Sequence, residues 1–251
     1  MANQTISKAF NTLFTYPIWR IEIDGENQLI AVETRNPEDT LPYLNVITFD
    51  GNSILQDFKI TVKEWVLAGI QCSKLILKKI SSNSPIEAGI LVIDCYSPKK
   101  QEIWSNYVFM GLVNYGVLVR PKMIEQGLQM FLDLNSLSIS NEKEIHIKPY
   151  ESKIVYPVIY NGEVPLFLKD FPIEGEIWIN AMDDYFIWAF YEKNKNDLYQ
   201  IRIIQSTRNE LINSLIAVSE LPLKFFNIYF LIDKQIFLLT DNKQEFVSYL
   251  V

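Results

Sequence analysis

Short runs of apolar and β-branched residues, separated by turn-forming residues, recur along almost the whole chain. In three successive groups of four such runs, the third run ends at Asp50, Asp94 and Asp133, which are 44 and then 39 residues apart. A repeating unit of about 40 residues with four short strands is typical of the blades of a β-propeller. This periodicity limits the possible folds more than any other feature of the sequence.

Each group is predicted to be an antiparallel meander, because tight turns join neighbouring strands. The run at 18–24 alternates apolar and polar residues and is followed by the turn Gly25-Glu26-Asn27. The strands predicted for the three groups are 18–24, 28–35, 43–50 and 53–58; 62–70, 74–80, 89–95 and 101–104; and 107–113, 117–120, 128–134 and 137–139.

Residues 142–171 are the least regular part of the sequence. Pro149, Pro157, Pro165 and Pro172 interrupt any strand ladder here, although 153–160 still reads as a strand. A degenerate blade and a long crossover both fit this segment. Regularity then returns, with predicted strands at 176–181, 185–192, 198–205 and 211–218, and at 225–232, 235–240 and 246–251. Residues 124–131 and 211–218 also carry apolar residues at helical spacing, but the surrounding meanders favour strands.

The last group contains only three predicted strands, and residues 8–14 precede the first complete group. An unpaired edge invites aggregation, so we expect the N-terminal segment to supply the missing strand. The predicted fold is therefore all-β: one domain over residues 1–251, a propeller of five to six four-stranded blades closed by the N-terminal strand. A two-sheet β-sandwich array is the alternative.

Composition excludes several classes of function. The net charge is −7, which argues against binding to nucleic acid or to an anionic membrane surface. The chain start has no basic region followed by an apolar one, and no apolar run approaches 18 residues, so we expect a cytoplasmic protein. Cys72 and Cys95 lie in apolar runs, which favours free thiols. His146 is the only histidine, so we expect no metal site and no cofactor.

Three hairpins carry a resemblance to a known family. In the first hairpin, residues 17–21 pair with 30–35. The second runs from 88–90 through Asp94 to Trp104, and the third runs from 224–226 to 236–239. In these stretches the chain resembles a bacterial family of unknown function from the Bacteroidetes group. The resemblance implies a propeller-like intracellular protein with no established activity. The middle hairpin is also similar to quinoprotein-type and WD-like blades, although the regular Trp and Gly positions of those blades are missing.

Two groups of residues are candidates for binding. Glu33 and Arg35 stand at i and i+2, hence on one face of a strand, where the guanidinium could bind a carboxylate or phosphate; a structural ion pair is the alternative. Tyr150, Tyr156 and Tyr160 cluster in the irregular middle segment, and long irregular segments on a rigid sheet scaffold often carry binding sites.

These features favour a non-catalytic intracellular binding module for an unidentified protein or small ligand. The alternative is a hydrolase or lyase with acidic residues at the mouth of a central channel. An enzyme would bring several carboxylates together at that mouth, whereas a binding module would expose an apolar or aromatic patch. We also expect Trp104 to be buried between neighbouring sheets, because an aromatic ring can fill the space where twisted sheets diverge.

Overall fold

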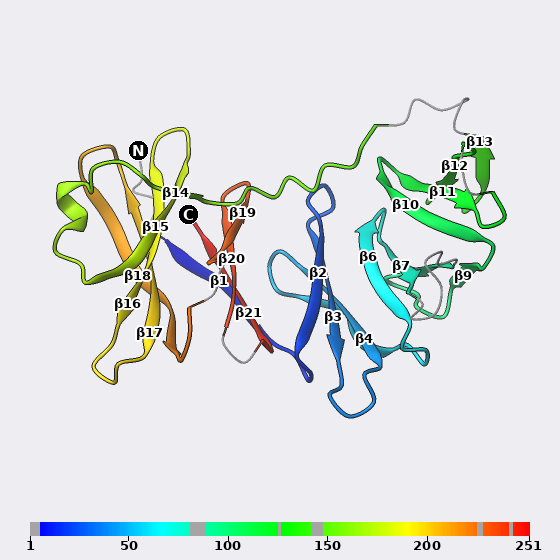
Figure 1. Cartoon of the computed structure of the whole chain (residues 1–251), viewed down its shortest axis with the longest axis horizontal. Helices are drawn as coiled ribbons and strands as arrows, with labels where there is room; N and C mark the ends of the chain where they lie inside the picture. The colour runs from blue at the N-terminus through cyan, green and yellow to red at the C-terminus, as the bar shows by residue number, and fades with distance from the viewer. Residues whose placement is uncertain (1–5, 81–88, 125–126, 142–147, 225–227, 241–242) are drawn as a thin grey trace. The chain divides into compact units, whose positions relative to one another are not determined.

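The computed structural model describes residues 6–80, 89–124, 127–141, 148–224, 228–240 and 243–251. Within them, strands form five antiparallel sheets, four with four strands and one with five (Figure 1). The all-β class and the five to six units predicted from the sequence are therefore confirmed, with five sheets. By its contacts the chain divides into two compact units, which we call the central unit (Phe14–Ser152) and the terminal unit (Met1–Leu13 with Lys153–Val251). One domain over residues 1–251 stays a prediction.

The central unit contains three sheets in which spatial order follows chain order. The first contains β2 (Ile18–Asp24), β3 (Leu29–Arg35), β4 (Pro42–Thr48) and β5 (Ser53–Lys59). The second contains β6 (Trp65–Gln71), β7 (Lys74–Lys79), β8 (Ile90–Asp94) and β9 (Gln101–Trp104). The third contains β10 (Tyr107–Val113), β11 (Gly116–Pro121), β12 (Met130–Asp133) and β13 (Ile139–Asn141).

The terminal unit contains the two remaining sheets. The larger has the order β14 (Val158–Ile159), β15 (Ile173–Ala181), β16 (Phe186–Lys193), β17 (Tyr199–Ser206) and β18 (Leu211–Leu221). The other has the order β1 (Ser7–Leu13), β21 (Glu245–Leu250), β20 (Gln235–Leu239) and β19 (Phe230–Ile232). A 3₁₀ turn, η2 (Leu166–Leu168), follows β14.

Aspartate side chains end three of the strands by capping the turn that follows. The Oδ1 atom of Asp94 accepts the backbone N–H groups of Tyr96 and Ser97 at 3.0 and 2.9 Å. Asp24 and Asp133 do the same for the residues two and three positions after them. This Asx-type capping explains why aspartate recurs in the repeat. Asp50 differs, because β4 ends before it, at Thr48.

The predicted role of the N-terminal segment as a strand of the last sheet is confirmed. β1 pairs antiparallel with β21, with Ser7 opposite Leu250 and Thr12 opposite Phe246. The Phe10 ring is buried, and its centroid lies 6.3 Å from that of Phe237 and 6.0 Å from that of Phe246. β1 thus contributes both backbone pairing and core volume.

The strand predicted at 153–160 is wrong in extent, because only Val158–Ile159 forms one. Pro157 has no N–H to donate to a ladder, and Val155 instead pairs with Leu231 through two backbone hydrogen bonds of 2.8 Å. For residues 142–171 the sequence left a degenerate blade and a long crossover as alternatives. The described residues of this segment fit a crossover, because they add only one short edge strand, β14, to the next sheet. For the strand predicted at 225–232, residues 225–227 lie outside the described residues.

Apolar clusters lie between neighbouring sheets inside each unit. In the central unit, one cluster joins the first two sheets and another, around Ile76 and Leu132, joins the second and third. Trp104 packs against the latter cluster but is only half-buried, because it ends the outer strand β9. In the terminal unit, a cluster that includes Tyr191 and Tyr249 joins the two sheets.

Candidate functional site

Glu33 and Arg35 face each other on β3, as their spacing predicts. The Glu33 side chain is fully buried, and its Oε1 atom lies 2.7 Å from Nε and 2.6 Å from Nη2 of Arg35. The second carboxylate oxygen accepts the backbone N–H of Leu67 at 2.7 Å. Leu67 belongs to β6, so this carboxylate joins the first two sheets of the central unit.

The other N–H groups of Arg35 also go to protein acceptors. Nη1 donates to the carbonyl oxygens of Thr40 and Lys63, each at 2.9 Å, and Nη2 donates to that of Trp65 at 2.9 Å. A guanidinium has five N–H donors, and these contacts together with Glu33 use all of them. The geometry thus gives the pair a structural role, and ligand binding by Glu33 and Arg35 stays a prediction.

The environment of this ion pair is partly apolar. Burial raises the pKa of Glu33, and the Leu67 N–H and the Arg35 guanidinium, which lower it, offset the rise only in part. On the solvent side, the guanidinium carbon lies 5.5 Å from the centroid of the Trp19 ring, a cation–π arrangement. Trp19 itself is 67% exposed.

The three predicted tyrosines fall in different units. Tyr150 belongs to the central unit, where its half-buried hydroxyl donates to the carbonyl of Ile23 at 2.8 Å, and burial raises its pKa. Tyr156 and Tyr160 belong to the terminal unit. Tyr160 donates to the carbonyl of Glu163 at 3.0 Å, and its ring meets that of Trp188 edge-on, with centroids 5.1 Å apart. Tyr160 therefore packs as part of the fold, whereas Tyr156 is 58% exposed.

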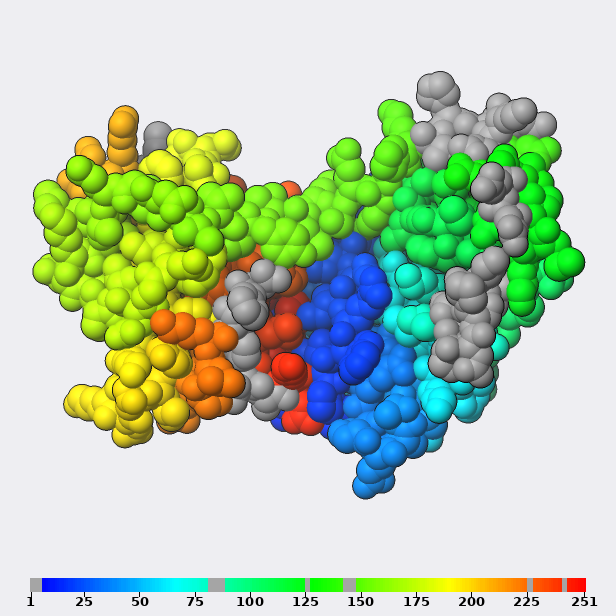
Figure 2. All heavy atoms as spheres, viewed as in Figure 1, coloured from blue at the N-terminus to red at the C-terminus, as the bar shows by residue number. Residues whose placement is uncertain are grey.

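Tyr156 belongs to a group of exposed apolar side chains that we call the crossover strip. Its members lie between residues 155 and 166, and each exposes at least two fifths of its surface: Val155, Tyr156, Val158, Ile159, Val164 and Leu166. Leu166 is the most exposed of them, at 79%. In Figure 2 the yellow-green part of the chain that includes these residues lies on the outside of the terminal unit.

The backbone of the crossover strip is nevertheless held in place. Val155 pairs with Leu231, the Asn180 amide donates to the carbonyl of Tyr156 at 3.3 Å, and the Tyr160 N–H donates to the carbonyl of Ile177 at 2.8 Å. After the strip, Leu168 is fully buried in a cluster with Trp188. The exposed apolar side chains of the strip are thus carried on a fixed backbone.

Sequence reasoning placed a partner surface in this segment but identified only its aromatic residues. It missed Val155, Val158, Ile159 and Leu166, which read as interior residues because most valines, isoleucines and leucines are buried. The available signal was the run Val-Tyr-Pro-Val-Ile-Tyr at 155–160, in which apolar residues follow one another without alternation around a proline. Such a run cannot bury both faces in an edge strand of two residues.

The described residues show neither a candidate metal centre nor a helix suited to crossing a membrane. They contain no group of three or more His, Cys, Asp and Glu side chains placed to hold a metal ion. His146 lies outside them. None of the helical segments that the structure describes has the length and apolarity needed to cross a bilayer.

The fold and this surface define an all-β protein of five antiparallel sheets with an exposed apolar crossover. No protein-family model matches the sequence, and no curated protein is significantly similar to it. Among solved structures, the chain is similar to one described as the crystal structure of BBS1N in complex with ARL6DN, soaked with mercury. The TM-score is 0.34 and the identity 10%, over 98% of this chain and 96% of that chain. A score this low supports no conclusion about the present chain, and the resemblance to a Bacteroidetes family stays a prediction.

Proposed function

We propose that this protein is a non-catalytic intracellular interaction module that binds a protein partner through the crossover strip. The observation that carries the proposal is the exposure of six large apolar side chains within twelve residues. Isolated exposed apolar residues are ordinary, whereas a contiguous group of them marks an interaction surface. Burying apolar surface contributes about 25 cal/mol per Å², so a partner that covers the strip gains binding energy from it.

The surroundings of the strip match the expected anatomy of an interface. Glu163, Lys169 and Asp170 are exposed beside the apolar residues and supply a charged rim. An apolar centre with a polar rim is the usual arrangement at protein interfaces. The fixed backbone lowers the entropy lost on binding. The partner would carry an apolar groove that receives Leu166 and Val158.

The finer fold and the compartment belong to the same proposal. We infer that the five sheets are the blades of a closed β-propeller, because four of them are meanders of the kind that blades contain and β1 completes the sheet of β19, β20 and β21. Both cysteines are free thiols, Cys72 half-buried and Cys95 buried. Free thiols agree with a reducing, cytoplasmic compartment.

Site-specific photo-crosslinking in cells that naturally make the protein tests the binding surface. A photoreactive amino acid at position 166 or 158 should give one discrete adduct with another protein. The same amino acid at position 195 should not, because Lys195 is also exposed in the terminal unit but belongs to the turn between β16 and β17 and not to the strip. Leu166→Asp should reduce the adduct formed from position 158 by about tenfold, the effect of losing an interface hot spot. Equal labelling from all three positions, or none from 158 and 166, would overturn the proposal.

A further inference from the structure

The terminal unit contains another ion pair on neighbouring strands, Glu192 with Arg202, which the proposed function does not use. Glu192 lies on β16 and Arg202 on β17, and the Arg202 Nε atom donates to the Glu192 Oε1 atom at 2.5 Å. The Gln200 amide donates to the other carboxylate oxygen at 2.9 Å, and only 2% of the Glu192 side chain is exposed. As in the pair of Glu33 and Arg35, the carboxylate is buried and both of its oxygens are used.

The two arginines differ in how many of their N–H groups the protein uses. All five N–H groups of Arg35 go to protein acceptors. Among the described residues, Arg202 donates only from Nε, to Glu192, and from Nη1, to the Ser214 hydroxyl at 2.9 Å. One N–H on Nη1 and both on Nη2 are left for another acceptor. Because 19% of the Arg202 side chain is exposed and none of its nitrogens is a buried atom without a partner, a ligand can reach them.

The guanidinium of Arg202 is held in place by three side chains. Glu192 binds Nε, Ser214 on β18 binds Nη1, and the guanidinium carbon lies 5.1 Å from the centroid of the Phe171 ring, a cation–π arrangement. A group that is already fixed loses little entropy when a ligand binds to it. The edge formed by Nη1 and Nη2 presents parallel N–H groups, which is the geometry that a carboxylate or phosphate binds through two oxygens.

An exposed apolar side chain and a hydroxyl lie beside this edge. Arg202 pairs with Ile216 in the β17–β18 ladder, so their Cβ atoms stand about 4.5–5.5 Å apart on one face of the sheet. Ile216 is 45% exposed. Ser214, two residues earlier, is on the same face, and among the described residues its O–H has no acceptor. A ligand oxygen can therefore also accept from Ser214, while an apolar part of the ligand covers Ile216.

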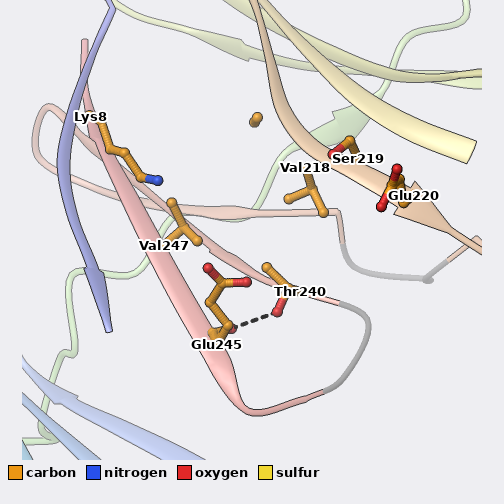
Figure 3. A pocket seen from close by; sticks show the side chains of 8 residues that line it. Lys8, Val218, Ser219, Glu220, Thr240, Glu245 and Val247 are labelled. Atoms are coloured by element: carbon orange, nitrogen blue, oxygen red, sulfur yellow. Dashed lines mark hydrogen bonds between the residues drawn. The ribbon is translucent and has the colours of Figure 1, made fainter. Parts of the chain in front are cut away.

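This face of β18 is not the one that borders the last sheet. Ala217, the residue after Ile216, packs against the cluster between the two sheets of the terminal unit. It also lines a depression that is open to solvent, in which Lys8 and Glu220 are exposed (Figure 3). Successive side chains of a strand point to opposite faces, so the depression lies across β18 from Ser214 and Ile216.

Glu192 limits the charge of a ligand at Arg202. The pair has a net charge near zero, so a bound anion brings its whole charge to a site that already contains a buried carboxylate. A carboxylate adds one negative charge, whereas a phosphate group adds about 1.5 to 2 at neutral pH. Like charges in a partly buried site repel each other more strongly than in water. The edge therefore favours a carboxylate over a phosphate.

We propose that Arg202 binds the carboxylate of an apolar acid, a class that includes the C-terminus of a peptide with an aliphatic last residue and free branched-chain acids. The carboxylate takes the N–H groups of Nη1 and Nη2 and the Ser214 O–H, and the apolar chain packs on Ile216. Carboxylate binding of this kind is what the sequence predicted for Arg35. Arg202 suits it better, because its guanidinium is fixed in the same way but keeps an edge open. None of these residues belongs to the crossover strip.

An NMR titration of the ¹⁵N-labelled full chain tests the site, with N-acetyl-L-leucine as a mimic of a peptide C-terminus and isovalerate as a free branched-chain acid. The Nε–H signal of Arg202, assigned by its loss in Arg202→Lys, should shift and saturate at millimolar concentrations of at least one acid, while that of Arg35 should not shift. N-acetyl-L-leucinamide, isovaleramide and inorganic phosphate should bind at least about tenfold more weakly, the loss expected for one charged hydrogen bond. Tighter binding of N-acetyl-L-leucine indicates a peptide terminus as the ligand, and tighter binding of isovalerate a free acid. No saturable shift with either acid, or equal binding of acids and amides, would overturn the proposal.

Two variants connect binding to this arrangement, with the backbone amide of Ser214 as the reporter. Arg202→Lys keeps a positive charge beside Glu192 but lacks the paired N–H groups, so the acids should bind about tenfold more weakly. Ile216→Ala should weaken isovalerate binding by about fourfold, the effect of uncovering one methylene group, and leave acetate binding unchanged. This surface variant decides the matter if Arg202→Lys does not fold.

Arg208→Lys is the matched control, since Arg208 is exposed in the turn between β17 and β18. It should bind the acids as the wild type does. Leu166→Asp, which tests the crossover strip, should also leave this binding unchanged, so the two proposals can fail separately. Acid binding that persists unchanged in both Arg202→Lys and Ile216→Ala would place the ligand elsewhere and overturn the assignment to Arg202.

Discussion

The buried carboxylate of Glu33 connects two sheets of the central unit through a single side chain. It accepts the Leu67 N–H on β6 and binds Arg35 on its own strand. A buried ion pair stabilises a fold little compared with apolar residues, but an unpaired charge left behind is strongly destabilising. Removing either Glu33 or Arg35 would therefore leave the other as an unpaired charge. Because Glu33 is buried, its effect on the unfolding free energy also depends on pH.

The unfolding free energy of the wild type should rise relative to that of Glu33→Gln as the pH falls. Burial raises the pKa of Glu33 in the folded state, so the folded chain takes up this proton at a higher pH than the unfolded chain does. The charged form thus acts against folding above the folded pKa. That effect fades as the pH falls through the folded pKa toward the unfolded value of about 4.3.

Urea unfolding of both proteins at neutral pH and near the unfolded pKa of Glu measures this difference. Glu38→Gln, at an exposed position in the loop after β3, controls for the loss of one charge. A difference between wild type and Glu33→Gln that is constant with pH, or that moves in favour of the variant in acid, would contradict the assigned burial effect.

At the scale of single residues, the sequence predicted the contact between Glu33 and Arg35 but not the backbone groups that these two side chains also bind. The i, i+2 spacing on a strand is enough to place both side chains on one face. The acceptors Lys63 and Trp65 reach Arg35 only through the packing of a second sheet, which no local pattern contains.

Strands are the elements that the sequence predicted best. Their bounds follow from apolar runs and from turns that aspartate caps locally, so β2, β9 and β10 begin and end where predicted. The prediction of a strand at 153–160 failed for two reasons. Pro157 cannot donate a ladder hydrogen bond, and Val155 pairs with Leu231, which lies more than seventy residues later in the sequence. Local chemistry determines most strands here, and long-range pairing determines the exceptions.

The contribution of β1 to the last sheet can be measured with one pair of variants. Phe10→Ala should lower the unfolding free energy by roughly 3–4 kcal/mol, because it empties a buried aromatic site against Phe237 and Phe246. Leu13→Ala, on the same strand but 71% exposed, should change it by less than about 0.5 kcal/mol. Chemical denaturation measures both, and equal losses in the two variants would contradict the packing of Phe10.

At the scale of the whole molecule, the two units differ in how the chain builds them. The central unit is one continuous segment, whereas the terminal unit combines the first strand with the last hundred residues. Ser7 lies opposite Leu250 in the β1–β21 ladder, so the start of the first strand lies beside the end of the last one. A linker from Val251 to Met1 would therefore turn an existing strand pair into a hairpin.

A circular permutant with that linker and with new ends between Ser152 and Lys153 should fold, because the cut falls at the boundary between the units. Its circular dichroism spectrum should match that of the wild type, and it should unfold cooperatively. The control permutant, cut between the buried residues Ala189 and Phe190 in β16, should not fold. An insoluble first permutant would show that the pairing of β1 with β21 does not tolerate a direct connection.

The pairing of the first strand with the last has a consequence for the protein while it is being synthesised. At about 5–20 residues per second, the ribosome needs on the order of ten seconds or more to reach β21 after it has made β1. Throughout that time Phe10 has neither Phe237 nor Phe246 beside it. The central unit is complete in sequence long before this, so until translation ends the nascent chain carries a first strand without its partner. A message truncated before β21 would yield a chain that keeps this strand unpaired, which chaperones and proteases can recognise.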